Sequence, residues 1–174
     1  MVYTKTLFLK KKKMNQEKFL EMTTEFTSNV VIIACYAEAM KSFGIVSKNE
    51  KEKEVTDYPY METGLKLSKL CNELFKKGEA YNNAMFKANN QSYTELKFKD
   101  HVQFMSKHLS ITENWEINQK RLSSLVLSLK STSRNLSGQR VNFNSGKTWK
   151  PSSFDKKRGS LILKIINDIE KLLS

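Results

Sequence analysis

The chain has 174 residues, of which 39% are hydrophobic and 28% are charged, and its formal net charge is +12. These values are typical of one ordinary globular domain and exclude a disordered or fibrous chain. The longest apolar run, at 30–37, has eight residues, whereas a membrane-spanning helix needs roughly 18. We therefore expect a soluble protein with a sizeable core.

The N-terminus is basic but does not have the order of a secretory signal. The apolar residues 7–9 precede the lysines, and neither an apolar region nor a small-residue cleavage site follows them. Cys35 and Cys71 have no CxxC spacing and fall on apolar faces of predicted helices. Buried thiols in a reducing compartment are thus favoured over a disulfide, and the sequence predicts an intracellular protein, cytoplasmic or nuclear.

The first helix is predicted over 16–43, because apolar residues from Phe26 onward recur at spacings of three and four. Its β-branched run at 30–33 would also suit a buried strand, but the stripe continues on both sides without a turn residue. Gly44 is a suitable end for the helix. The segment 47–57 alternates in charge and reads as a linker with nothing to bury.

A second helix is predicted to begin near Asp57, with Pro59 tolerated in its first turn, and to extend to about Ala88. Gly78 weakens its middle and is a point at which it could split. Ser92 and Glu95 then have the spacing of a capping box.

The apolar stripe that follows the box runs through 98–129, and a second box-like sequence occupies 110–113. Either one helix of about 38 residues or two helices with a bend near Ser110 would produce this pattern. Periodicity stops after Ser131, so a long loop is predicted over 132–152. Six apolar residues between Ile162 and Leu173 then form the broad stripe of a last helix.

Together these elements predict an all-α fold, an antiparallel bundle of four to five helices with a long basic loop before the last helix. Residues 1–14 would be a basic N-terminal arm and residues 15–174 a single helical-bundle domain. No internal repeat and few strand or hairpin signals compete with this interpretation.

The positive charge is concentrated in two segments. Residues 1–13 contain five lysines and no acid, and residues 132–160 contain seven basic residues and one acid. They account for +11 of the net charge of +12, so the remaining chain is nearly neutral. The sequence therefore predicts a basic patch, although a solvated lysine tail at the N-terminus is an equally strong interpretation of its first part.

The second segment interleaves cations with Phe143, Trp149 and Phe154. Such rings stack on nucleic-acid bases while the cations meet phosphates, or they pin a long loop onto the helices. The candidate polyanion-binding residues are Lys10, Lys11, Lys12, Lys13, Arg134, Arg140, Lys147, Trp149, Lys150, Lys156, Lys157 and Arg158.

The candidate phosphate-binding, metal-binding and catalytic motifs lack the residue spacing or the neighbours that these sites require. The SGKT at 145–148 follows Gly138 by too many residues for a phosphate-binding loop and has no strand before it. His101 and His108 would lie about 10.5 Å apart along a helix, too far to share a metal ion. Glu113 and Glu116 have no nucleophile beside them. We expect no catalytic residues, metal or cofactor.

Three functional classes remain. The first is a non-enzymatic interaction or scaffold protein, whose helix stripes and basic segments bind a protein partner or a second copy. The second is a nucleic-acid-binding protein that uses the arm and the basic aromatic loop. The third is a protein that binds an anionic membrane surface. No small-molecule substrate is inferred.

Overall fold

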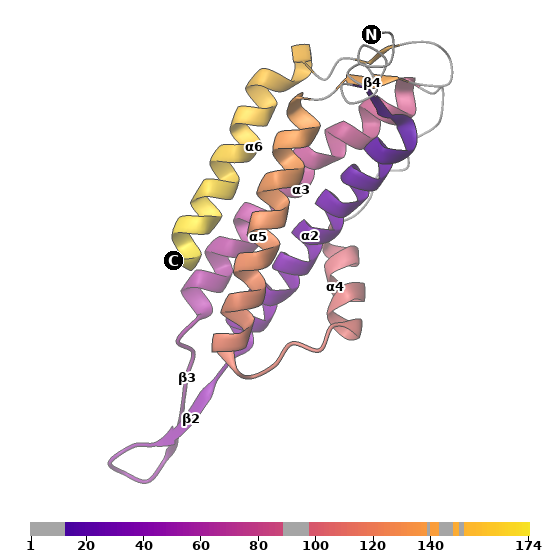
Figure 1. Ribbon diagram of the computed structural model, residues 1–174. Helices are drawn as coiled ribbons and strands as arrows, with labels where there is room; N and C mark the ends of the chain where they lie inside the picture. Colours follow the sequence, from indigo (N-terminus) through magenta and orange to yellow (C-terminus); the bar gives the residue numbers. More distant parts are fainter. Residues whose placement is uncertain (1–12, 89–97, 139, 143–147, 150–151) are drawn as a thin grey trace.

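The computed structural model describes residues 13–88, 98–138, 140–142, 148–149 and 152–174 (Figure 1). Within these ranges the chain is mostly helical, which confirms the all-α class. Five helices are present there: α2 (Gln16–Ser42), α3 (Met61–Ala88), α4 (Phe98–His108), α5 (Trp115–Gly138) and α6 (Ser152–Leu173).

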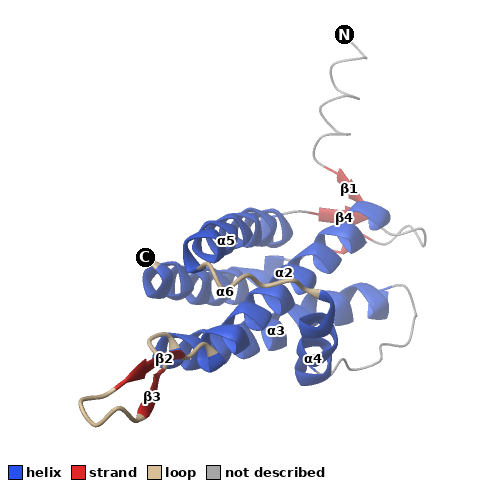
Figure 2. Cartoon of the chain, turned by 90° about the horizontal axis from the view of Figure 1, so that it is seen from below, coloured by secondary structure: helices blue, strands red, loops and turns tan. Residues whose placement is uncertain are grey.

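The four long helices form a closed ring of neighbours. Helix α2 packs against α3 and α5, and α6 closes the ring by packing against the same two helices. The short helix α4 lies outside this ring, against α2 (Figures 1 and 2). The largest side chains that are fully buried come from all four long helices: Phe26, Ile33, Leu67, Leu74, Leu122, Leu129, Leu136, Ile162 and Ile166.

Helix α2 is the most enclosed element, and it runs through the β-branched stretch. Val30, Val31 and Ile33 are all buried within it. Because three other helices contact α2, it buries apolar residues on several sides and needs no polar outer face over this stretch. Helical packing therefore overrides the strand preference of these residues.

Helix α3 continues through Gly78 without a split. A Cβ atom on Gly78 would lie 2.3 Å from Cε1 of Phe26, whose ring is only 1% exposed. This contact explains the glycine, because it lets the aromatic ring of α2 approach the backbone of α3 directly.

The alternative of two helices after 97 is correct, and the break spans 109–114. Asn114 caps α5, since its Oδ1 accepts a hydrogen bond from the Glu116 backbone N–H at 3.1 Å. The fully buried Asn118 secures the connection by donating to the Thr112 carbonyl at 2.6 Å. Asn114 therefore holds the position that the sequence suggested for Ser110.

The predicted loop over 132–152 is shorter than expected, because residues 132–138 continue α5 and α6 begins at Ser152. Thr132, Ser133 and Leu136 are buried. The Thr132 hydroxyl donates to the Ser128 carbonyl at 2.9 Å, which satisfies a polar group inside the helix. Small polar residues at these positions hid the helical period in the sequence.

The segment predicted as a linker contains a β-hairpin. Strands β2 (Ile45–Lys48) and β3 (Glu54–Asp57) pair antiparallel and extend away from the helices (Figures 1 and 2). Asn49 closes the turn, because its Oδ1 accepts the backbone N–H groups of Lys51 and Lys53, both at 3.0 Å. Every residue of the two strands is exposed, so the expectation that this segment buries nothing holds.

Replacing residues 45–57 by a short Gly-Ser linker should change the free energy of unfolding by no more than about 1 kcal/mol, because exposed residues contribute little to the core. The replacement keeps Phe43 and Tyr60, which flank the hairpin and contact each other with tilted rings whose centroids are 5.8 Å apart. Urea denaturation followed by circular dichroism measures the change. Loss of cooperative unfolding would show that the hairpin is part of the folding unit.

Candidate functional site

A small sheet joins the two basic segments of the chain. Strand β1 (Lys13–Asn15) pairs in parallel with β4 (Arg140–Asn142), so that Lys13 is opposite Arg140. Strand β5 (Thr148–Trp149) pairs antiparallel with β4, with Trp149 opposite Val141. Residues 1–13 lead into this sheet and 132–160 contain two of its strands. The described strands of the two basic segments therefore lie together in one sheet (residues 13–15, 140–142 and 148–149), which we call the basic end (Figure 2).

The candidate polyanion-binding residues divide among the elements around the basic end. Lys13, Arg140 and Trp149 lie in the sheet. Arg134 is exposed on α5, and Lys157 is exposed on α6. Lys156 and Arg158 are also in α6. Five of the candidates lie outside the described residues: Lys10, Lys11, Lys12, Lys147 and Lys150.

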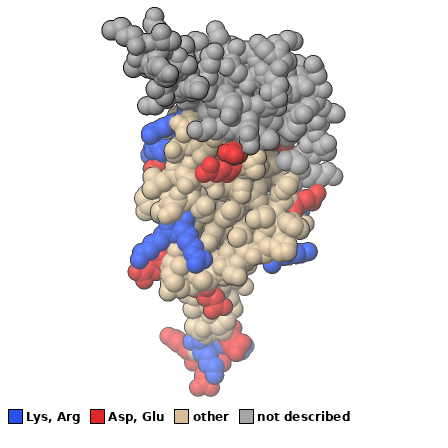
Figure 3. All heavy atoms as spheres, turned by 45° about the vertical axis from the view of Figure 1, so that its right-hand side comes forward, with Lys and Arg blue, Asp and Glu red and all other residues tan. Residues whose placement is uncertain are grey.

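On the face shown in Figure 3, basic and acidic side chains are interspersed over the described residues. Several are paired: Lys41 with Glu38 at 2.6 Å, Lys66 with Glu62 at 3.1 Å, and Lys130 with Glu170 at 2.8 Å. These pairs compensate part of the charge on α2, α3, α5 and α6. Outside residues 1–13 and 132–160 the net charge is only +1, so the uneven charge of the chain belongs to its two basic segments.

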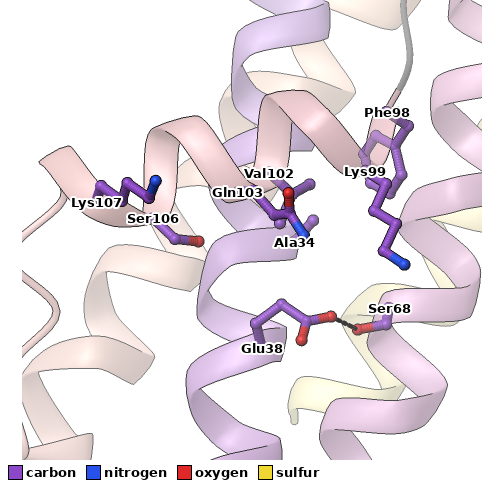
Figure 4. A pocket seen from close by; sticks show the side chains of 9 residues that line it. All are labelled: Ala34, Glu38, Ser68, Phe98, Lys99, Val102, Gln103, Ser106 and Lys107. Atoms are coloured by element: carbon purple, nitrogen blue, oxygen red, sulfur yellow. Dashed lines mark hydrogen bonds between the residues drawn. The ribbon is translucent and has the colours of Figure 1, made fainter.

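A second feature is a groove of about 630 Å³ where α4 lies beside α2 and α3 (Figure 4). Two contacts fix α4 next to it. The Cys35 thiol donates to the Val102 carbonyl at 3.6 Å, and the Phe98 ring packs at a tilt against Phe75 with centroids 4.8 Å apart. The residues that line the groove are Ala34, Glu38, Ser68, Phe98, Lys99, Val102, Gln103, Ser106 and Lys107.

The three charged residues that line the groove differ in whether they have partners. Besides its ion pair with Lys41, the Glu38 carboxylate accepts a hydrogen bond from the Ser68 hydroxyl at 3.3 Å. Lys99 and Lys107 form no ion pair or hydrogen bond with any residue in the described ranges. The groove therefore presents two uncompensated cations on α4 opposite a carboxylate that already has partners.

Both cysteines are free and buried, as the sequence predicted. Burial raises the pKa of the Cys35 thiol, although a hydrogen bond with Ser106 opposes the shift. Burial also raises the pKa of Cys71 well above its usual value. Because the thiolate is the reactive form, neither group has the properties of a nucleophile or a metal ligand.

The two histidines lie against aromatic rings. His101 is 6.4 Å from Phe75 and His108 is 4.7 Å from Phe104, measured between ring centroids. Among the residues that the structure describes, no cluster of three or more histidine, cysteine or acidic side chains could hold a metal ion. None of the described helices is long and apolar enough to cross a membrane.

The groove is the feature that sequence reasoning missed. Its only signal is the spacing of Lys99, Gln103 and Lys107, which places them four residues apart on one side of a helix. That pattern is common on solvated helices, so contact with α2 and α3 is what distinguishes it. No family model, curated protein or solved structure matches this chain.

Proposed function

We propose that the chain is a non-enzymatic interaction protein, an antiparallel helical bundle that binds nucleic acid through its basic end. The observation that carries this proposal is the parallel pairing of β1 with β4, which brings the two basic segments together. The antiparallel arrangement is supported by the packing of α2 on α3 and of α5 on α6, since each pair is consecutive among the long helices.

The concentration of positive charge in two segments supports binding to a polyanion. Each phosphate that a lysine or arginine neutralises releases condensed counterions, and this release drives binding to nucleic acid. Two basic segments held on one body reach a shared ligand at a high effective concentration. A nearly neutral remainder adds little attraction or repulsion, so the basic end would direct the orientation of the bound polyanion.

The helix stripes favour this proposal over a partner-binding bundle. Ile162, Ile166 and Ile169 of α6 have no exposed surface, and Ile165 has 7%. The broad stripe of the last helix therefore packs inside the chain and leaves little for a protein partner. Binding to an anionic membrane surface would use the same lysines. An experiment is therefore needed to separate that class from nucleic-acid binding.

Changing Lys10, Lys11, Lys12 and Lys13 to Gln should weaken binding to a labelled DNA duplex and lower the salt dependence. The slope of log K against log salt concentration should fall by about 0.9 for each phosphate that these lysines no longer neutralise. Fluorescence anisotropy at several salt concentrations measures both effects.

The matched control changes Lys48, Lys51, Lys53 and Lys66 to Gln, which removes the same charge from the hairpin and from α3. We expect its slope to equal that of the unmodified chain. Equal slopes in the two variants would contradict the proposal. Binding to vesicles that contain phosphatidylserine, without binding to duplex or single-stranded DNA, would replace it by the membrane-surface class.

A further inference from the structure

The groove beside α4 has the features of a second binding site, separate from the basic end. We propose that it binds an acidic peptide segment in an extended conformation, with an apolar side chain between two carboxylates. The residues of this site come only from α2, α3 and α4, so the site is independent of the nucleic-acid proposal.

The polar wall of the groove defines the charge of the ligand. Lys99, Gln103 and Lys107 lie along α4, with Lys99 toward one end of the groove and Lys107 toward the other (Figure 4). The two lysines are eight positions apart in the helix, which corresponds to about 12 Å along the axis. Because neither ammonium group has a partner among the described residues, the site favours a ligand with two separated anionic groups.

The floor of the groove defines the group between those anions. Ala34 and Val102 are buried at 3% and 8% exposure, and Phe98 is partly buried beside them. A volume of about 630 Å³ accommodates a large side chain with part of its backbone. An apolar side chain placed there would gain free energy from burial, which a purely polar ligand would not.

An extended peptide matches this arrangement. Residues i, i+2 and i+4 of a strand point to the same side and span about 13 Å, close to the distance along α4 between the lysines. Acidic residues at i and i+4 would then meet Lys99 and Lys107, with the residue at i+2 over the apolar floor. Nucleic acid fits less well, because it presents charges at shorter intervals and has no apolar side chain to bury.

Glu38 on the opposite wall does not cancel the attraction. Its carboxylate is already paired with Lys41 and hydrogen-bonded to Ser68. The charged residues that line the groove are two lysines and one glutamate. Because Lys41 already compensates the charge of that glutamate, the site remains positive. A Glu38 oxygen can also accept a backbone N–H of the peptide, and strand-like ligands offer such donors.

The test uses a fluorescein-labelled peptide with the core Glu-Ser-Phe-Ser-Glu. Changing Lys99 and Lys107 to Gln should weaken its binding about tenfold, because two partly exposed ion pairs are removed. The matched control changes Lys164 and Lys171 to Gln on α6, which is not a neighbour of α4. It removes the same charge and should leave the affinity unchanged.

Two further measurements keep the test specific. A peptide with Ser in place of Phe should bind the unmodified chain more weakly. In both lysine variants the Cys35 thiol should stay protected from a thiol reagent, because α4 still covers it. Equal affinities of the two lysine variants for the Phe peptide would overturn the proposal. So would an affinity for single-stranded DNA that falls in the Lys99 and Lys107 variant and not in the control, because the groove would then bind nucleic acid.

Discussion

Deleting residues 160–174 should give an aggregated or molten protein instead of a cooperatively folded one. The deletion removes most of α6 and uncovers the faces of α3 and α5 that it contacts. Ile162, Ile165, Ile166 and Ile169 are all buried. Burial of each is worth about 1.5–3 kcal/mol, and the total stability of a domain is only about 5–15 kcal/mol.

Size-exclusion chromatography and thermal unfolding measure the outcome of this deletion. A control variant changes Lys164, Asn167 and Asp168 to Ala, which leaves the buried isoleucines of the same helix unchanged. It should stay monomeric, with a change in stability within about 0.5 kcal/mol for each site. A truncated chain that remained monomeric and unfolded cooperatively would show that the apolar stripe of α6 serves a partner and not the core.

The helices were predictable where a continuous apolar stripe faces the core. The isoleucines of α6 are the clearest case, because their spacing alone predicts a buried helix face, without reference to any other part of the chain. The first helix was expected over 16–43 and is observed as Gln16–Ser42. In both cases local periodicity and tertiary packing select the same residues, so sequence alone was sufficient.

The end of α5 was not predictable in this way. Thr132 and Ser133 are buried polar residues in a helix, and hydropathy alone places such residues in a loop. Their burial depends on neighbouring helices, and at Thr132 a hydrogen bond to the Ser128 carbonyl compensates for it. The hairpin was missed for a related reason, since its strands have no buried face and therefore no alternating apolar pattern.

The basic end could be predicted in composition but not in geometry. Charge counting located both segments, whereas the pairing of Lys13 with Arg140 depends on a three-residue parallel ladder between distant parts of the chain. So short a ladder has no periodic signature. The groove depends even more on tertiary structure, because Glu38 and Ser68 join Lys99 only when three helices meet.

The crossing of α2 and α3 gives the second large expected effect. Changing Gly78 to Ala should lower the free energy of unfolding by about 1–3 kcal/mol, because the new methyl group collides with the Phe26 ring. On an exposed part of a helix, the same change would stabilise by about 1 kcal/mol. Urea denaturation of the variant and the unmodified chain measures the difference.

A double-mutant cycle with Phe26→Leu distinguishes the collision from any other effect of Gly78. The shorter side chain lacks the ring atoms that a Cβ on Gly78 would meet, the nearest of which is Cε1 at 2.3 Å. Phe26→Leu alone should destabilise the fold by leaving space in the core. In that background Gly78→Ala should become neutral or stabilising, so the two changes would be strongly coupled. The same cost of Gly78→Ala in both backgrounds would mean that the glycine serves the backbone of α3 itself and not the approach of α2.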